Sequence, residues 1–518
     1  MSAIACRKGV IVYESDLLNN LGLDKYCALK RTFTRTVQLK HNQYKSSTLV
    51  KAENTPNGKI LIISRFLAQI YIKRNILKSI KNVIVDGQKI NITKFNCNPY
   101  PIQQTVHDYI INNHLNETLA SKGLAGLSLE LEAGLGKTYV AAMVCKTLSL
   151  KTVYIVPSSE YLLEQAEDDF KKCFPEMKLG RYYGKAKYDG DVVFMIINSV
   201  TSKEFLLDGK KISPKEFFSR FGLAIWDESH EYATRERSKA FTAVNCKYMM
   251  GVTAEVNNRE DKMDFISHYG IGLPVYADKI PGFDLPDEDR YKSNVKIIRY
   301  AGPPEYCKNL INEANGMMSA SKMSKQILCD YYRMEVIVDY AMDLYKNNHN
   351  LFVWCDTRAG VNILRDILSE LGVNVLTPEM DTPLNKNVAY LMGGTTKEDI
   401  IKAQNSRVIV ATYQYAYRGV SLPKFDAMIF ATPRRAKIYQ TLKRIFRMGG
   451  DTSIIRQIVD IVDVKTKLKN QLSDRMKQYK RELFGMTIKN IKINYSDIEP
   501  KNKLIFNRIT NKYIPPLG

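Results

Sequence analysis

The residues with the clearest chemical potential form a short glycine loop, Glu132-Ala133-Gly134-Leu135-Gly136-Lys137-Thr138. An apolar run, Leu124–Leu131, precedes this loop and a helix-forming run, Tyr139–Leu148, follows it. A glycine loop between a strand and a helix N-terminus presents backbone N–H groups to phosphate. We therefore expect residues 133–136 to wrap a phosphate, Lys137 to reach the outer phosphates of a nucleotide, and Thr138 to place its hydroxyl on Mg²⁺. Leu131 stands where the general pattern GxxxxGK[ST] has its first glycine.

Two consecutive carboxylates, Asp227 and Glu228, follow the apolar run Leu223–Trp226, roughly ninety residues after the loop. Asp227 is placed to hold Mg²⁺, and Glu228 to orient and deprotonate an attacking water. An acid pair after an apolar run often marks no more than the end of a strand. Combined with the glycine loop, it predicts a nucleotide-hydrolysing site.

These residues need a scaffold of buried strands separated by helices. Short apolar runs alternate with helix-length segments from about residue 99, as in parallel α/β sheets. The first series is Leu124–Leu131, Thr152–Val156, Val192–Ile197, Leu223–Trp226 and Tyr248–Val252. The second is Leu351–Trp354, Asn374–Leu376, Val408–Ala411, Ala427–Phe430 and Ile458–Val462. Two series predict two sheets, with the Pro-, Asp- and Gly-rich segment Gly282–Pro304 as the linker.

The segment Asp227-Glu228-Ser229-His230 resembles the DExH box of superfamily 2 helicases, and the loop around Lys137 resembles motif I of that superfamily. Other segments of the first series resemble further motifs in the expected order. The resemblance implies that Gln103 contacts adenine and that His230, Thr253 and Ala254 couple nucleotide state to domain closure. It also assigns nucleic-acid backbone contacts to Pro157, Ser158, Gln165, Asn198 and Ser199.

The second series continues the resemblance through Leu351–Cys355, Gly393-Gly394 and Ala411–Ser421 to Gln440–Arg447. It implies nucleic-acid contacts for Gly394 and Thr412, a nucleotide contact for Gly419 and a coupling role for Gln440. Arg444 and Arg447 would be arginine fingers, since two arginines three apart on one helix share a face. Departures from the family pattern are Glu255, Lys443 and Ser229.

The matches run from Tyr100 to Arg447 and look most similar to helicases of large cytoplasmic DNA viruses, including the poxvirus transcript-release type. They imply an α/β fold of two tandem RecA-like P-loop lobes with parallel sheets, a small basic N-terminal domain and a basic C-terminal tail. The expected domains are 1–98, 99–290, 291–470 and 471–518. The resemblance also implies ATP and Mg²⁺ as cofactors.

Charge is concentrated at the ends of the 518-residue chain, whose formal net charge is +22. Residues 1–98 hold 17 Lys/Arg against 5 Asp/Glu, and residues 471–518 hold 10 against 4. Basic ends on a nearly balanced body favour contact with phosphate backbones, although residues 1–98 could instead form a structural brace. Arg31, Arg35, Lys40, His41 and Lys45 alternate there with aromatic and hydroxyl side chains.

The remaining composition argues for an intracellular protein without membrane spans. The most apolar stretch, Lys59–Lys73, is interrupted by Arg65, and the nine cysteines include no CxxC pair. We expect a cytoplasmic location (host cytoplasm or virion for a viral protein), with the nucleus left open.

The leading hypothesis is a monomeric, ATP-dependent helicase or translocase that acts on DNA in viral-type replication, repair or transcription, possible partners being proteins of those processes. An RNA helicase or transcript-release ATPase would use the same motifs. A non-catalytic nucleic-acid-binding subunit would have lost Lys137 or Glu228, and both are present. A P-loop motor without a nucleic-acid partner is disfavoured by the motif series and the basic ends.

Overall fold

The computed structural model divides the chain into two compact units, Met1–Asp284 and Leu285–Gly518. The division falls inside the expected linker. In the described part of the chain no helix is both long and apolar enough to span a membrane. The structure describes residues 2–6, 9–38, 44–132, 134–157, 160–207, 209–244, 246–257, 259, 261–284, 291–313, 316–377, 382–417, 422, 424–435, 438–446, 450–480 and 485–514.

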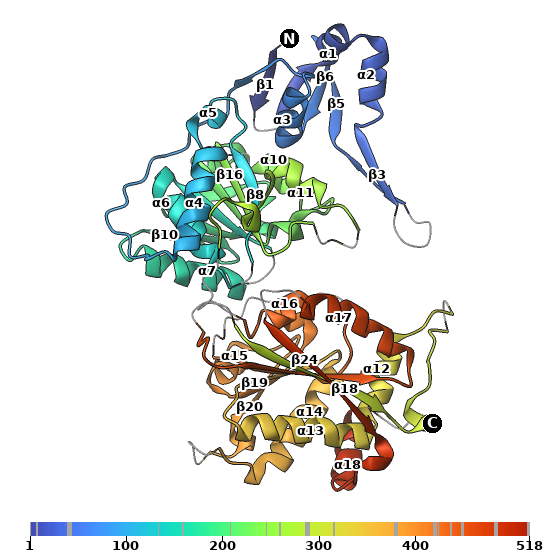
Figure 1. Ribbon diagram of the computed structural model, residues 1–518. Helices are drawn as coiled ribbons and strands as arrows, with labels where there is room; N and C mark the ends of the chain where they lie inside the picture. Colours follow the sequence, from blue (N-terminus) through green and yellow to red (C-terminus); the bar gives the residue numbers. More distant parts are fainter. Residues whose placement is uncertain are drawn as a thin grey trace. The chain divides into compact units, whose positions relative to one another are not determined.

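The N-terminal part of the first unit is a small sheet with its own apolar core (Figure 1). Its strand order is β5-β6-β2-β1-β7, with β1 pairing parallel to β7 and antiparallel to β2. The strands are β1 Ser2–Cys6, β2 Gly9–Tyr13, β5 Val50–Thr55, β6 Gly58–Ile63 and β7 Ser79–Asn82. The helices are α1 Glu14–Leu21, α2 Leu23–Lys30 and α3 Arg65–Lys73, and a separate hairpin is formed by β3 Thr34–Gln38 and β4 Tyr44–Thr48.

Arg65 attaches this small sheet to the rest of the first unit. Its buried guanidinium donates hydrogen bonds to the carbonyl oxygens of Gly123 and Ala125, just before one central strand, and of Cys246 and Lys247, just before another. Burial lowers the pKa of Arg65 to about 9. The charge that interrupts the apolar stretch Lys59–Lys73 therefore serves a packing role.

The first large sheet has the order β11-β10-β12-β9-β15-β16-β8-β17, and its central strands pair in parallel. Strands β9, β12 and β16 are buried along their whole length, as strands covered on both faces must be. The strands are β8 Gly126–Glu130, β9 Thr152–Val156, β10 Leu179–Tyr183, β11 Ala186–Tyr188, β12 Val192–Ile196, β15 Leu223–Asp227, β16 Tyr248–Thr253 and β17 Leu273–Tyr276. The helices are α4 Pro101–Asn113, α5 Glu117–Ala120, α6 Lys137–Leu148, α7 Glu160–Cys173, α8 Ile197–Val200, α9 Pro214–Ser219, α10 Lys239–Ala243 and α11 Phe265–Gly270; β13 Phe205–Leu207 and β14 Lys210–Ile212 form a short hairpin.

The second unit contains a parallel sheet of order β20-β21-β19-β22-β23-β18-β24. Figure 1 shows α13 and α14 on one face of this sheet and α16 and α17 on the other. The strands are β18 Ser293–Ala301, β19 Leu351–Cys355, β20 Val388–Leu391, β21 Val408–Thr412, β22 Ala427–Phe430, β23 Arg456–Asp463 and β24 Met486–Asn494. The helices are α12 Ala320–Leu328, α13 Tyr331–Lys346, α14 Arg358–Leu371, α15 Lys397–Asn405, α16 Ile438–Leu442, α17 Leu472–Tyr479 and α18 Lys503–Tyr513.

The predicted α/β class with two parallel sheets is confirmed, with some differences in detail. Asn374–Leu376 is not a strand, because the chain makes a 3₁₀ turn at Gly372–Asn374 before Val375 packs inward. Strand β18 begins inside the expected linker. In the region expected to be a basic tail, β24 pairs with β18 over its full length, while Phe506 of α18 is buried in the core.

Candidate nucleotide-hydrolysis site

The glycine loop lies between β8 and α6, as the sequence predicts. Gly136 caps the N-terminus of α6 with φ +82°, and Gly134 has φ +90°, so both adopt the left-handed conformation that glycine tolerates best. A Cβ atom on Gly136 would lie 2.2 Å from Gln103 Nε2. The first backbone N–H groups of α6 have no partner within the helix and favour an anion. Ala133 lies outside the described residues.

Gln103, expected to contact adenine, is buried against the glycine loop. Its Nε2 atom donates to the Leu135 carbonyl oxygen at 3.0 Å, and its Oε1 atom accepts from the Tyr100 backbone N–H at 3.0 Å. The side-chain amide therefore ties the start of α4 to the loop. An adenine contact stays a prediction.

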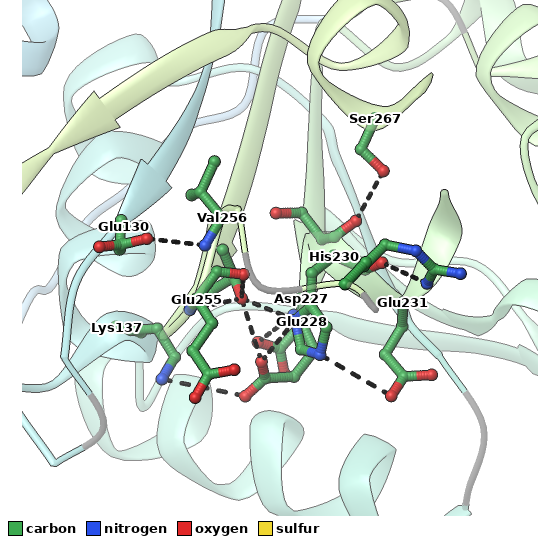
Figure 2. A network of polar contacts seen from close by, with 12 residues as sticks. Glu130, Lys137, Asp227, Glu228, His230, Glu231, Glu255, Val256 and Ser267 are labelled. Atoms are coloured by element: carbon green, nitrogen blue, oxygen red, sulfur yellow. Dashed lines mark hydrogen bonds and ion pairs between the residues drawn. The ribbon is translucent and has the colours of Figure 1, made fainter. Parts of the chain in front are cut away.

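Asp227 and Glu228 lie at the carboxyl end of β15. The glycine loop follows the carboxyl end of β8, which lies at the same edge of the parallel sheet. Glu228 has φ +47°, a left-handed conformation that is costly for a residue with a Cβ atom. Glu228 Oε1 lies 3.9 Å from Lys137 Nζ, and the Glu228 backbone N–H donates to Asp227 Oδ1 at 3.0 Å. The structure thus brings together the three residues expected to perform the chemistry (Figure 2).

The electrostatic environment of Asp227 favours binding of a cation. Burial raises the pKa of Asp227 to about 7, and the neighbouring Glu228 charge adds to that effect while Lys137 opposes it. A positive ion beside the carboxylate would favour its charged form and lower the pKa again. The ionisation of Asp227 therefore depends on nearby positive charge.

The residues around Asp227 fit Mg²⁺, which is commonly bound through one or two carboxylates together with substrate phosphates and water. Asp227 would hold the ion together with Thr138, the second residue of α6. The hydroxyl of the buried Tyr154 has no hydrogen-bond partner among the described residues. Burial, and then the charge of Asp227, raise the pKa of Tyr154 well above its ordinary value, which ties this phenol to the same site.

A second polar cluster, centred on Thr253 at the end of β16, contacts the Glu228 carboxylate. Thr253 Oγ1 lies 2.7 Å from His230 Nδ1 and 3.4 Å from Glu228 Oε2, and it also contacts the backbone of Glu255. His230 Nδ1 is 3.4 Å from Glu228 Oε2. Thr253 and His230, two of the expected coupling residues, are therefore in contact, and Ala254 is buried beside them. Figure 2 shows the Glu255 side chain, a departure from the family pattern, pointing toward Lys137 and Glu228.

The residues expected to contact nucleic acid in the first unit gather after β9 and β12. Pro157 follows β9 directly, and Asn198 and Ser199 lie in α8 directly after β12. Parallel strands end at the same edge of a sheet, so these residues share an edge with the acid pair. Gln165 lies in α7, and its Oε1 atom is buried without a partner among the described residues. Ser158 lies outside the described residues.

In the second unit, Thr412 ends β21, and its buried hydroxyl has no partner within the described part of the chain. Gly394 is exposed with φ +93°. Gln440 lies in α16, where its Oε1 atom is buried. Gly419 and Arg447 lie outside the described residues.

The helix expected to carry both arginines ends before them. Helix α16 stops at Leu442, and the Arg444 backbone N–H bonds to the Thr441 carbonyl oxygen three residues back, so the chain tightens into a turn. Lys443 and Arg444 are buried there. The shared helical face expected for the arginines at 444 and 447 is therefore not formed by α16.

Two residues that support the site, Glu130 and Arg259, could not be predicted from the sequence. Glu130 at the end of β8 accepts a hydrogen bond from the Val256 backbone N–H at 2.7 Å. Arg259 donates to the His230 carbonyl oxygen at 3.1 Å. Neither belongs to a local pattern with chemical meaning, because each acts on a partner brought near only by folding.

Comparisons with known proteins agree with the fold and the motifs. Residues 67–258 match the family model described as type III restriction enzyme, res subunit. The chain is 29% identical over 374 residues to QP509L of African swine fever virus, named as a candidate ATP-dependent RNA helicase, and the match covers 68% of each chain. It is 24% identical over 405 residues to uvsW of Enterobacteria phage T4, named as an ATP-dependent DNA helicase, and covers 70% of this chain and 74% of that one.

Among solved structures, the DUF1998 helicase MrfA bound to DNA and AMPPNP matches 97% of this chain and 62% of its own, with a TM-score of 0.50 and 12% identity, which shows a shared fold. The resemblance stated from the motifs is thus confirmed. Over about two thirds of its length the chain is similar to proteins named as ATP-dependent helicases in African swine fever virus and in phage T4.

Proposed function

We propose that this helicase-type ATPase uses ATP hydrolysis to move along DNA and to separate its strands. The observation that carries the proposal is the meeting of Lys137, Asp227 and Glu228 at the carboxyl edge of a parallel sheet, beside a glycine loop shaped for phosphate. The ordered motifs and the helicase names of the relatives connect that chemistry to nucleic acid.

In this proposal each residue has a separate task. Lys137 and the N-terminus of α6 bind the β- and γ-phosphates. Asp227 and Thr138 would hold Mg²⁺, which, when bound, neutralises charge on the phosphates. Glu228 accepts a proton from the attacking water, and His230 and Thr253 keep its carboxylate in place.

Roles for Arg444 and Arg447 follow from the family resemblance. We propose that both act on the γ-phosphate as arginine fingers, which stabilise the charge that develops during phosphoryl transfer. Arg444 is a buried residue in a turn that follows α16 of the second unit.

The choice of DNA rests on the DNA helicase of phage T4 among the relatives. RNA is the second candidate, because the African swine fever virus relative carries the name of an RNA helicase. Both substrates present the same phosphodiester backbone, which most helicase contacts address.

The test is the ATP hydrolysis rate of the purified chain without polymer and with single-stranded DNA, duplex DNA or single-stranded RNA. Lys137→Ala serves as the inactive control, and the salt dependence reports phosphate contacts. Strong stimulation by DNA that is lost in Lys137→Ala supports the proposal. Preferential stimulation by RNA favours the second candidate, and a flat response to every polymer overturns both.

A further inference from the structure

The β3–β4 hairpin is anchored to a segment that also contacts the two residues directly after the acid pair, Ser229 and His230. We call residues 259 and 261–270, which end in helix α11, the bridge segment. Lys45 Nζ of the hairpin lies 2.7 Å from Asp261 Oδ2, and the Arg35 guanidinium carbon lies 4.4 Å from the centre of the Phe265 ring. Two cations of the hairpin therefore rest on the bridge segment.

The bridge segment also contacts the turn formed by residues 227–230, which we call the DExH turn. Arg259 pairs with Asp261 through two bonds, Nε to Oδ1 at 2.9 Å and Nη2 to Oδ2 at 2.8 Å. Its remaining nitrogen, Nη1, donates to the His230 carbonyl oxygen at 3.1 Å. Ser267 of α11 donates to the carbonyl oxygen of the neighbouring Ser229 at 3.0 Å. These contacts fix the backbone of the turn whose His230 imidazole and Glu228 carboxylate form the hydrolysis site.

A continuous series of contacts thus runs from Lys45 through Asp261 and Arg259 to His230, and on through Thr253 to Glu228. Asp261 is the shared point, since its carboxylate bonds to both cations. Although burial alone would raise the pKa of Asp261, hydrogen bonds from Arg259 and Lys45 hold it below its ordinary value. Asp261 is therefore charged at neutral pH, and any anion that approaches Lys45 competes with it.

The residues of this series differ in solvent exposure, which is highest at Lys45. The Lys45 side chain is 45% exposed, whereas those of Asp261 and Arg259 are about half as exposed, at 21% and 20%. A ligand can therefore reach Lys45 more readily than Arg259.

The surface around Lys45 suits a polyanion. None of residues 34–38 and 44–48 is acidic, and they include Arg35, Lys45 and a set of hydroxyl groups. Thr36 and Ser46 face each other across the hairpin with 2.7 Å between their hydroxyl oxygens. Cations and hydroxyls next to the exposed aromatic Tyr44 are the groups that proteins use to contact a phosphodiester backbone with some base stacking.

We propose that the β3–β4 hairpin binds the nucleic-acid backbone and that Asp261 and Arg259 transmit this binding to the DExH turn. A backbone phosphate that pairs with Lys45 weakens its pair with Asp261, and Asp261 then pairs more completely with Arg259. The hydrogen bond that Arg259 donates to the His230 carbonyl oxygen changes as a result. Asp261 and Arg259 are positioning residues in this scheme, which rests on the proposed nucleic-acid-dependent ATPase.

The experiment compares Lys45→Gln, Asp261→Asn and the double variant in ATP hydrolysis across a titration with the stimulating polymer. Lys59→Gln is the matched control, because it breaks an ion pair of similar exposure, with Glu14 at 3.1 Å, elsewhere in the N-terminal part of the first unit. Each variant's stimulation is expressed relative to its own rate without polymer, and its thermal unfolding is recorded. Arg259→Lys, which keeps the charge but loses the two-bond geometry, is a second route if Asp261→Asn does not fold.

A partly exposed ion pair contributes modestly, so we expect the maximal stimulation to fall by a factor of about two to five in either single variant. The double variant should fall no further, because both changes interrupt one series of contacts. Arg259→Lys should lower the stimulation in the same way, and Lys59→Gln should behave like the wild type.

Two outcomes would overturn the inference. In one, Lys45→Gln raises only the half-saturating polymer concentration and leaves the maximum unchanged, so that Lys45 is a simple phosphate contact. In the other, the effects of the two single variants multiply in the double variant. The proposed function fails separately, if the wild-type ATPase does not respond to any polymer.

Discussion

Replacing Thr253 by valine removes one hydroxyl from the centre of the site without changing the shape of the side chain. Thr253 is fully buried, at the end of β16. Its oxygen lies 2.7 Å from His230 Nδ1, accepts from the Glu255 backbone N–H at 3.2 Å, and lies 3.4 Å from Glu228 Oε2. Valine keeps the β-branched packing that suits a strand, so the change isolates these polar contacts.

The expected magnitude follows from the partners that lose the hydroxyl. A hydrogen bond contributes about 1 kcal/mol net, and a buried group left without a partner costs about 1–3 kcal/mol. With the contacts to His230, to the Glu255 backbone and to Glu228 removed, we expect the free energy of unfolding to fall by about 2–3 kcal/mol. If about 1.4 kcal/mol of that loss affects the position of Glu228 in the transition state, kcat falls about tenfold.

The assay is steady-state ATP hydrolysis with saturating polymer, combined with denaturant unfolding. The KM for ATP should stay within about twofold, because Lys137 and the glycine loop are untouched. Thr152→Val is the matched control: it removes a buried hydroxyl that donates to the Leu150 carbonyl oxygen at 2.8 Å, at the opposite end of a strand of the same sheet. Equal losses of kcat in Thr253→Val and Thr152→Val would refute the reasoning.

Three further predictions concern the two units. Arg333→Met should lower the free energy of unfolding by about 3–5 kcal/mol, because it leaves the buried Asp463 carboxylate, which Arg333 contacts at 2.7 and 3.1 Å, without its cation. Denaturant unfolding should show that adding Asp463→Leu recovers much of this loss, and a further loss would contradict the account. Burial raises the pKa of Asp330 to about 6, so its contribution to stability is present at low pH and is lost as the pH rises from about 4 to 6. The wild type should therefore lose stability relative to Asp330→Asn across that window, and a difference independent of pH would argue against the shift. Gly136→Ala should weaken nucleotide binding at least about tenfold, since φ is +82° and the new Cβ atom meets Gln103 at 2.2 Å; unchanged affinity in a fluorescent-nucleotide titration would show that the loop adapts.

The sequence predicts the parts of the molecule that depend on local patterns. The run Thr152–Val156 coincides with β9, and Ala427–Phe430 coincides with β22, because a buried parallel strand needs an unbroken apolar stretch. The glycine loop and the acid pair that follows it predict that Lys137 and Glu228 act in one nucleotide-hydrolysing site. Their approach to 3.9 Å is what the fold adds.

The parts that could not be predicted depend on partners far apart in the chain. Arg65 acquires its role only when carbonyl groups near residues 123 and 246 surround it. Asp261 and Lys45 are separated by more than two hundred residues and have no shared pattern. The sequence of β24 is half-polar and therefore predicts a basic tail, and only its pairing with β18 makes it a strand of the sheet.

The helix expected to carry Arg444 and Arg447 differs from its prediction for another reason. The spacing of Arg444 and Arg447 fits one helical face, yet the backbone N–H groups of Arg444 and Ile445 bond to carbonyl oxygens three residues back rather than four. Tertiary packing of Ile445 and Phe446, both buried, overrides the local helical preference there.

The role of Glu228 as the proton acceptor is tested most directly by comparing ATP binding and ATP hydrolysis in Glu228→Gln. This variant removes the proton acceptor and leaves Lys137 and the glycine loop in place, while Glu231→Gln, three residues along the chain, is the matched control. We expect Glu228→Gln to bind ATP with near-normal affinity and to lose at least about 100-fold in polymer-stimulated kcat, with Glu231→Gln largely active. Hydrolysis by Glu228→Gln at the wild-type rate would contradict the assignment of this site.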